Sequence, residues 1–431
     1  MNDIKVSDVF GVRKEMVLSY IERENVDGKF ENALESDRHI VIYGSSKQGK
    51  SALVQKHISE DKMISIGCGP KMSTQDIYKS LLRQIGIKIE TSQEKTQNSS
   101  GEVTVKTSIK ALLPFGQAKA EAGAKISEED ENKVSYSHIE FNLEIAQDIS
   151  ELLDECNFDK LIIIENFHYL DEEEQKTLAF DLRHFQEKGY KFIILGIWRE
   201  KNRLIQFNGD LLDRITEIPV EPWENKDFDF VIEKGSEILN INFSEEIIAE
   251  MKDISFGNIG ILQELCKETC LAAEITEKCD DHNTIKNNDY FEKAIEIKVY
   301  QYSSRHLRVL ESIADAGKKY REGLFMPYYL VIVIIQSDID DLKDGISRRS
   351  LTDKIREIHY RGEDVRSSDI SYLLHNLAES QSKKKIIPPL FDYDRVNRRL
   401  RIIDTSLTFF LNFENSKEII EVIPDPTENI S

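Results

Sequence analysis

A short stretch near the N-terminus constrains the fold of this chain more than any other part of it. Residues 40–54 read Ile-Val-Ile-Tyr-Gly-Ser-Ser-Lys-Gln-Gly-Lys-Ser-Ala-Leu-Val, so an apolar run leads into G-x-x-x-x-G-K-S and then into a helical segment. A glycine-rich loop between a strand and a helix lets backbone N–H groups point at the phosphates of a nucleotide. An ordinary glycine-rich turn is the alternative, but chance rarely places one in this context. The stretch therefore predicts a phosphate-binding loop in a parallel α/β sheet.

Each residue type of this predicted loop has a separate role. The two glycines allow the tight curl, and the helix that starts near Lys50 adds the positive end of its dipole. Lys50 is expected to reach the β- and γ-phosphates, and the Ser51 hydroxyl to hold Mg²⁺. The predicted cofactors are therefore ATP and Mg²⁺. The predicted binding residues are Gly44, Ser45, Ser46, Lys47, Gln48, Gly49, Lys50, Ser51 and Ala52.

Length and composition indicate a folded chain of two or three domains. Of the 431 residues 40% are hydrophobic, which is typical of a globular protein rather than a disordered one. No apolar run is long enough to cross a bilayer, and the N-terminus lacks the apolar core of a signal peptide. The five cysteines are scattered without C-x-x-C spacing, which favours reduced thiols. We therefore expect a cytoplasmic protein that does not engage a membrane.

The charge of the chain limits its nucleic-acid partners. A formal net charge of -21 opposes indiscriminate binding to DNA, RNA or anionic membranes. The charge is unevenly spread, however, because residues 300–413 carry a small excess of Lys and Arg over Asp and Glu. Any DNA-binding surface is therefore expected in that C-terminal third.

A second apolar run ends in a carboxylate and supplies the other half of the expected site. Residues 161–164 are Leu-Ile-Ile-Ile, followed by Glu165 and Asn166. A carboxylate that ends a buried central strand emerges beside the phosphates, so Glu165 is assigned to Mg²⁺ as the Walker B acid. Asn166 stands where the water-activating glutamate normally does, and an amide cannot act as a general base. Hydrolysis is therefore expected to be slow, unless Glu165 polarises the water or another group takes the place of the missing base. His168 is a candidate proton acceptor or γ-phosphate sensor, or else only packs after the strand.

Three further candidate residues lie next to expected strands of the same sheet. Trp198 and Arg199 end a strand that starts near residue 191, at the sheet edge where open α/β sheets bind ligands. Either side chain is a candidate γ-phosphate sensor. Arg214 lies directly ahead of a last short strand at residues 216–220.

Residues 91–142 interrupt the expected sheet. Period-two alternation at residues 102–110 and 117–122 predicts an inserted β-hairpin, with residues 112–116 between its strands. An acidic tip at 128–132 and a further strand near 133–141 are expected to follow. The insertion is predicted to contact a partner subunit or an effector, or to be a packed surface hairpin or a mobile loop without such a role.

The order of these parts resembles an AAA+ or closely related STAND-type ATPase, in particular the origin-recognition and initiator-like group. The resemblance runs from about residue 15 to 290 and continues into the C-terminal domain. It implies an α/β fold: a P-loop NTPase parallel sheet flanked by helices, with a helical lid and a C-terminal winged-helix domain. In that family an Arg before the fifth strand reaches the neighbouring subunit's nucleotide, and Arg214 holds the matching position. The resemblance thus implies a homo-oligomer in which Arg214 is catalytic, whereas a surface salt bridge is the alternative role.

The family's second sensor usually begins where Phe256-Gly-Asn-Ile-Gly260 lies, but its usual Arg is missing from this helix. Together with Asn166, that absence favours a nucleotide-governed switch over a fast motor. The expected domains are an ATPase core at 1–224 that includes the insertion, a helical lid at 225–299, a winged-helix domain at 300–413, and an acidic tail at 414–431.

The pattern of the C-terminal third is compatible with a winged helix. Helices are expected at 305–316, 347–360, 367–377 and 404–413, strands at 385–393 and 400–404, and a wing between the strands at 392–399. The residues from 414 onward are expected to fray. The basic residues expected to meet phosphates of DNA are Lys383, Lys384, Lys385, Arg395, Arg398, Arg399 and Arg401. Winged helices also dock proteins, so a partner protein is the alternative.

The sequence therefore predicts an ATP-binding switch with slow hydrolysis, in which Glu165, Asn166 and Arg214 form the catalytic set. The winged helix would engage DNA or a partner protein. One alternative is a non-hydrolysing DNA-binding regulator in which the nucleotide only stabilises the fold. Another is the ATPase subunit of a bacterial defence or mobile-element system that signals to a separate effector protein.

Overall fold

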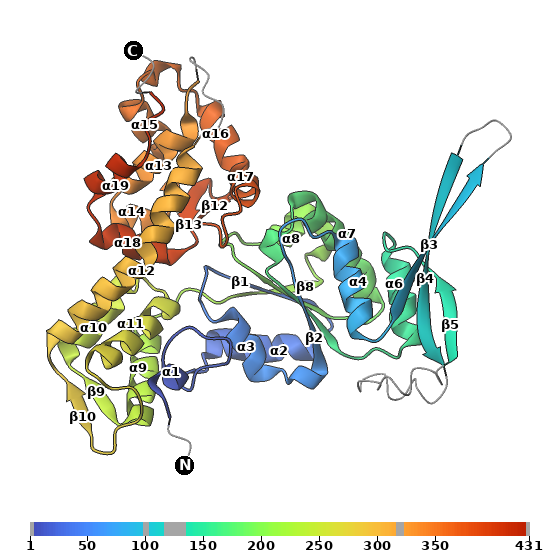
Figure 1. Cartoon of the computed structure of the whole chain (residues 1–431), viewed down its shortest axis with the longest axis horizontal. Coiled ribbons are helices and arrows are strands. Elements are labelled where there is room, and N and C mark those ends of the chain that lie inside the picture. Colours follow the sequence, from blue (N-terminus) through green and yellow to red (C-terminus); the bar gives the residue numbers. More distant parts are fainter. Residues whose placement is uncertain (1–3, 98–102, 116–134, 316–322, 428–431) are drawn as a thin grey trace.

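The computed structural model describes residues 4–97, 103–115, 135–315 and 323–427. Its centre is a five-stranded sheet in which every neighbouring pair is parallel, in the order β2-β6-β7-β1-β8 (Figure 1). The five strands are β1 (His39–Tyr43), β2 (Met63–Gly67), β6 (Leu161–Glu165), β7 (Phe192–Gly196) and β8 (Ile215–Pro219). Because all strands run the same way, their carboxyl ends meet at one edge of the sheet. The predicted α/β class is confirmed.

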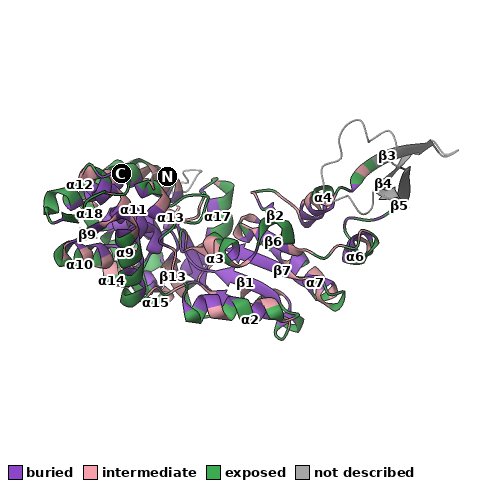
Figure 2. Ribbon diagram, turned by 90° about the horizontal axis from the view of Figure 1, so that it is seen from below, coloured by how far each residue is buried: buried purple, intermediate pink, exposed green. Residues whose placement is uncertain are grey.

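Helices cover both faces of this sheet because successive residues of its strands point to opposite sides. In β1, Ile40 and Ile42 pack on one face of the sheet, whereas Val41 and Tyr43 pack on the other, and each face is covered by its own group of helices. Burial is complete along β1 and β7, which Figure 2 shows as a continuous buried layer. The first group is α2 (Lys29–Glu35) and α3 (Lys50–His57), and the second includes α4 (Thr74–Gln84), α6 (Ala146–Glu155), α7 (Glu172–Glu187) and α8 (Arg203–Phe207).

The insertion is a three-stranded antiparallel sheet that extends away from the body (Figure 1). Its strands, β3 (Lys88–Gln97), β4 (Val103–Phe115) and β5 (Ser135–Glu140), pair in that order. β4 pairs with β3 from Lys88 to Gln97, a partner strand that the predicted hairpin did not include. β4 also continues through Pro114, since β5 pairs with it from Lys110 to Phe115. The expected strand near 133–141 is present as β5, while residues 117–122 and 128–132 lie outside the described residues.

A helical group follows the sheet. It consists of α9 (Asn225–Leu239), α10 (Glu245–Ile254) and α11 (Ile259–Ala272), with a small parallel pair, β9 (Ile241–Phe243) and β10 (Asn283–Ile285). The N-terminal helix α1 (Val6–Val9) packs on α9 and α11, and a Cβ on Gly235 would lie 2.2 Å from the ring of Phe10.

Helix α12 (Asn288–Ala314) runs without a break from this group into the C-terminal group (Figure 1). The expected boundary at 299/300 therefore falls inside a helix, and the helix expected to begin at residue 305 begins at Asn288. The cause is local, because the segment contains neither glycine nor proline and its buried face continues from Phe291 to Leu310.

The C-terminal group combines helices with the antiparallel sheet β11-β13-β12. The expected strand at 385–393 forms only from Phe391. Residues 416–422, which were expected to fray, form helix α19: Ile419 is buried, and the Ser416 hydroxyl donates to the carbonyl of Ile335 at 3.1 Å. The elements are α13 (Met326–Gln336), α14 (Ile339–Asp344), β11 (Ile346–Ser347), α15 (Arg348–Ile358), α16 (Ser367–His375), α17 (Leu377–Lys383), β12 (Phe391–Asp394), β13 (Arg399–Ile402), α18 (Thr405–Phe413) and α19 (Ser416–Val422).

Short helical turns complete the described chain, and within the residues given above no helix is long and apolar enough to span a membrane. The turns are η1 (Glu24–Gly28), η2 (Glu60–Lys62), η4 (Phe167–Tyr169), η5 (Gly209–Leu211) and η6 (Gly362–Asp364).

Candidate nucleotide-binding site

The predicted phosphate loop joins β1 to α3 at the carboxyl edge of the sheet. Gly49 adopts φ of 83°, a left-handed conformation that side chains disfavour, and helix α3 begins at the next residue. Gly44 is required for another reason, because a Cβ there would lie 2.7 Å from Cγ2 of Val220. Both glycines therefore have a steric role in shaping the loop.

Lys50 lies inside the loop. Its Nζ donates to the carbonyl oxygens of Gly44, at 2.9 Å, and Ser45, at 2.6 Å. Burial lowers the pKa of Lys50 to about 8, because the charged ammonium loses hydration there. An anionic phosphate would favour the charged form, so the environment suits a group that binds phosphate.

The loop borders a cavity of about 320 Å³ into which the expected metal ligands also project. Ser51 lines it from α3, and Glu165 and Asn166 line it from the end of β6. The Glu165 carboxylate accepts from the Ser65 hydroxyl at 3.0 Å. A hydroxyl and a carboxylate beside a phosphate loop are oxygen ligands of the kind Mg²⁺ takes, so the residues present fit that ion.

Segments distant in sequence close the other side of this cavity. Tyr20 and Arg23 line it from the N-terminal segment, together with Trp223 from the chain after β8. The Arg23 guanidinium lies 3.6 Å above the Trp223 ring and donates to the carbonyl of Val220 at 3.1 Å. Trp223 was not identified from the sequence. The signal was available, because Trp223 follows the last strand at the same sheet edge.

His168 lines the cavity from η4, directly after Glu165 and Asn166. Its Nδ1 accepts a hydrogen bond from the backbone N–H of Ile197 at 3.2 Å. Its Nε2 is buried and has no hydrogen-bond partner among the described residues. Burial, aided by the positive charge of Lys50, lowers the pKa of His168 to about 3. The ring is therefore neutral and does not take up a proton near neutral pH.

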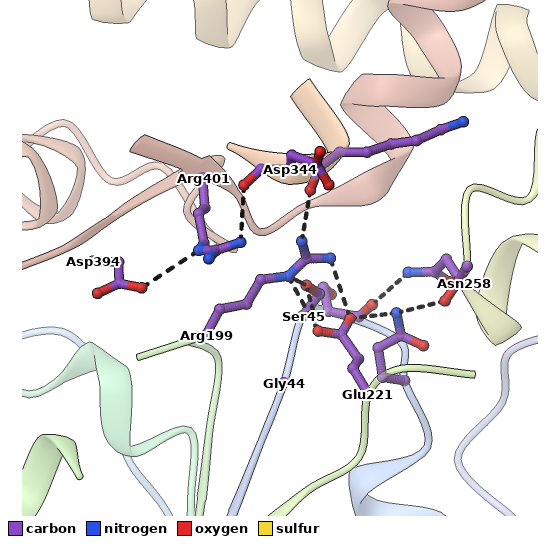
Figure 3. Close-up of polar contacts among 12 residues, drawn as sticks. Gly44, Ser45, Arg199, Glu221, Asn258, Asp344, Asp394 and Arg401 are labelled. Carbon is purple, nitrogen blue, oxygen red and sulfur yellow. Dashed lines mark hydrogen bonds and ion pairs between the residues drawn. The ribbon is translucent and has the colours of Figure 1, made fainter. Parts of the chain in front are cut away.

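The two predicted sensors, Trp198 and Arg199, do not line this cavity. Trp198 is fully buried and folds back over Gly196, where a Cβ would lie 1.4 Å from its ring. Arg199 lies on the outer side of the loop, where its Nε donates to the Ser45 hydroxyl at 2.8 Å and to Glu221 at 3.1 Å (Figure 3). The sequence placed both correctly at the sheet edge but could not give the direction of their side chains.

Glu221 organises the outer side of the loop, and sequence reasoning missed it. Its carboxylate accepts from the Ser45 hydroxyl, at 3.2 Å, and from Gln48 Nε2, at 2.5 Å, in addition to pairing with Arg199 (Figure 3). The Asn258 amide donates to the carbonyl of Ser46 at 3.0 Å. The loop is thus held from the chain after β8 and from the start of α11.

The C-terminal group also contacts the loop. The Ser46 N–H donates to the carbonyl of Ile403 at 3.0 Å, and the Lys47 ammonium lies 5.2 Å from the Tyr302 ring centre. Arg199 Nη1 lies 3.5 Å from the carbonyl of Lys343. The phosphate loop is therefore packed between the nucleotide cavity and the C-terminal group.

Arg214 lies at the opposite edge of the sheet. Its carbonyl accepts from the N–H of His39, at the start of β1, whereas the phosphate loop follows the end of β1. Its guanidinium donates to Gln186 and, at 3.0 Å, to Glu187. Arg214 therefore lies away from the nucleotide cavity of its own chain.

Most of the basic residues expected to meet DNA have polar contacts within this chain. Arg395 pairs with Glu172 of α7 at 2.9 Å, and Arg401 donates to the carbonyl of Asp344 at 3.2 Å. Lys383 pairs with Glu379 at 2.5 Å, Lys384 donates to the carbonyls of Ser312 and Asp315, and Arg399 donates to the carbonyl of Gly345.

Comparisons with solved structures place this arrangement in a known fold. A Walker-type ATPase of Pyrococcus abyssi is similar over 91% of this chain and 96% of its own, with a TM-score of 0.50 at 14% identity. The Orc1 protein of Aeropyrum pernix in complex with DNA matches over 92% and 90%, with a TM-score of 0.38 at 9% identity. A RuvB variant of Thermotoga maritima matches over 89% and 92%, with a TM-score of 0.39 at 14% identity. No protein-family model and no curated protein matches the sequence.

The likeness to the Walker-type ATPase, together with the strand order β2-β6-β7-β1-β8, identifies the fold. The chain has the AAA+-type fold of P-loop NTPases, as the sequence predicted. In this order β7 lies between β1 and β6, so His168, Ile197 and the loop meet at neighbouring strand ends.

Proposed function

We propose that this protein is an ATP-binding switch that hydrolyses ATP slowly and signals nucleotide occupancy to its C-terminal group. The observation that carries the proposal is the shared cavity of Lys50, Ser51 and Glu165. These residues supply a phosphate-binding ammonium and two oxygen ligands for Mg²⁺, which would neutralise charge on the phosphates when bound. Gly44 to Ala52 form the binding loop in this proposal.

Slow hydrolysis follows from the side chains around the attacking water. Asn166 has no basic group to accept a proton, and the neutral ring of His168 already has its Nδ1 lone pair engaged by Ile197. Glu165 is assigned to the metal in this scheme. Asn166 is left to orient water through its amide, which supports a long-lived ATP state.

The signalling route is supported by the contacts on the outer side of the loop. Phosphate binding would draw Lys50 away from the carbonyls of Gly44 and Ser45. Ser45 also contacts Arg199 and Glu221, and the next residue, Ser46, contacts Ile403. A rearrangement of the loop would therefore be transmitted to the C-terminal group.

Assembly through Arg214 completes the proposal. Arg214 would enter the nucleotide site of a neighbouring copy and stabilise charge on the transferring phosphoryl group. The surface around it supports a contact between copies, because Leu212 is 60% exposed, as is Phe180 on α7. Exposed apolar side chains at such a position favour burial against a partner.

We further propose that residues 300–413 form a winged helix that engages a partner protein, with DNA as the alternative ligand. The β11-β13-β12 sheet beside α15 and α16 supports the winged helix. The intramolecular contacts of Arg395 and Arg401 favour a protein partner, because these cations already have carboxylate or carbonyl partners. A separate effector and a cytoplasmic location are part of the same proposal.

The test is to measure particle size with and without ATP·Mg²⁺ while phosphate release is followed in the same samples. We expect ATP-dependent assembly with slow release of phosphate. Repeating both measurements with duplex DNA separates the two ligands: a protein-docking module leaves them unchanged, whereas DNA-stimulated release would favour DNA. An unchanged particle size with rapid release by monomers would contradict the switch.

A further inference from the structure

The hydrogen bonds of His168 determine where its proton lies. The backbone N–H of Ile197 can only donate, so the Nδ1 atom that it contacts at 3.2 Å must be the ring's lone-pair acceptor. The ring is neutral because burial and the charge of Lys50 lower its pKa to about 3. A neutral imidazole whose Nδ1 accepts carries its hydrogen on Nε2. His168 therefore presents a buried N–H donor on its Nε2 side.

His39 shows what such a ring looks like when both nitrogens are satisfied. Its Nδ1 accepts from the N–H of Phe192 at 3.0 Å, and its Nε2 donates to the carbonyl of Leu182 at 2.7 Å. The Nδ1 atom of His168 accepts from a backbone N–H in the same way, at the other end of β7. Its Nε2 atom, however, has no hydrogen-bond partner among the described residues. A buried donor without a partner is costly and usually indicates a ligand, an ordered water or a functional role.

The position of His168 indicates the ligand that completes this pattern. The residue lines the nucleotide cavity between the ends of β6 and β7, together with Lys50 and Glu165. Lys50 lies near enough for its charge to lower the pKa of the ring. The lysine of a phosphate loop reaches the β- and γ-phosphates, so a donor beside it at the strand ends meets the outer phosphate oxygens. An anionic oxygen is a strong acceptor for an N–H group.

We infer that His168 donates its Nε2–H to the terminal phosphoryl group of bound ATP, and that this contact discriminates a triphosphate from a diphosphate. The inference rests on the proposed function, because it concerns the same cavity. His168 acts here as a neutral donor and never as a base, which makes it a binding residue for the switch and a substitute for the sensors that Trp198 and Arg199 do not provide.

The test compares His168→Phe, which keeps an aromatic ring but has no donor, with His168→Gln, whose amide restores an N–H. Binding of ATPγS·Mg²⁺ and of ADP·Mg²⁺ is measured separately by calorimetry. Loss of a charge-assisted hydrogen bond predicts about a tenfold to hundredfold weaker affinity for ATPγS in the Phe variant, with little change for ADP. The Gln variant is expected to recover part of the ATPγS affinity.

Equal weakening for both nucleotides, or no weakening for either, would overturn the inference. A fall in hydrolysis with unchanged ATPγS affinity would also overturn it, because His168 would then contact the water instead. If His168→Phe does not fold, nitrogen NMR of the wild-type histidines decides. The Nε2–H resonance of His168 should shift with ATPγS·Mg²⁺ and not with ADP·Mg²⁺, and equal shifts would count against the inference. Wild-type protein that binds neither nucleotide would instead refute the proposed function itself.

Discussion

The backbone N–H of Ser46, inside the phosphate loop, donates a hydrogen bond to the carbonyl oxygen of Ile403 at 3.0 Å. The two residues come from opposite ends of the chain, and the contact places the C-terminal group directly on the outside of the loop. A loop in this position cannot rearrange around phosphate without affecting that contact. The relationship gives the proposed switch a physical basis.

Glu221 should be one of the most important side chains for the stability of the loop. Glu221→Ala leaves donors on Ser45, Gln48 and Arg199 without their shared acceptor. We expect a loss of about 2–3 kcal/mol in the free energy of unfolding, measured with urea. The control is Glu379→Ala, which removes an exposed pair with Lys383 and should cost about 0–1 kcal/mol. Equal losses in the two variants would show that the Glu221 contacts contribute no more than a surface pair.

Asn166→Glu tests the proposal that Asn166 keeps hydrolysis slow. The substitution places a carboxylate at the end of β6 where it can accept a proton from water, so we expect phosphate release to rise by about 10²-fold. Asn166→Ala removes the amide without adding a base and should show no such rise. The measurement is single-turnover hydrolysis with saturating ATP·Mg²⁺. A Glu variant no faster than the Ala variant would show that residue 166 does not limit the reaction.

Arg214→Ala should spare nucleotide binding and remove hydrolysis that depends on assembly. Arg214 lies at the sheet edge away from its own phosphate loop, so the affinity of an isolated chain for ATP has no reason to change. Arg183 is a matched control, because it also contacts Glu187 and lies on the same surface. If Arg214→Ala and Arg183→Ala behave alike in phosphate release measured against protein concentration, Arg214 has only the salt-bridge role.

The buried, neutral His39 is expected to make the protein less stable in acid. Burial lowers the pKa of His39 to about 4, below its usual value near 6.5, so the unfolded chain takes up the proton at a higher pH than the folded chain. Its contribution to stability is complete above pH 6.5 and falls as the pH decreases from 6.5 to 4. By pH 5 the expected loss from this residue is about 2 kcal/mol. Urea unfolding of wild type and His39→Gln at pH 7.5 and pH 5 measures it, and the two proteins should differ in their pH dependence. Parallel pH profiles would contradict the assignment.

The central sheet and the position of the glycine-rich loop at its carboxyl edge could be predicted because their signals are local. A continuous apolar run marks each buried parallel strand, and the carboxyl ends of such strands meet at one edge. Once the strands before them were identified, Lys50, Ser51 and Glu165 could be expected to lie at the same edge, and they line one cavity. The sequence also placed Asn166 and His168 at that edge.

The remainder depends on tertiary packing that local patterns do not encode. Helix α13 was missed because it is buried nearly all round and shows no amphipathic period. The direction of the Arg199 side chain is determined by its ion pair with Glu221, which lies in the chain after β8. Arg395 binds Glu172 of α7, a contact between distant segments that composition cannot reveal. In each case the deciding partner lies far away in sequence.

The most direct test of the central claim is a calorimetric titration of the full chain with ATP·Mg²⁺, compared with Lys50→Ala. Lys50 supplies the buried ammonium of the phosphate loop, so wild type should bind one nucleotide per chain and the variant should show no measurable binding. A folded wild-type protein that takes up no nucleotide, or a Lys50→Ala protein that binds as tightly as wild type, would contradict the account.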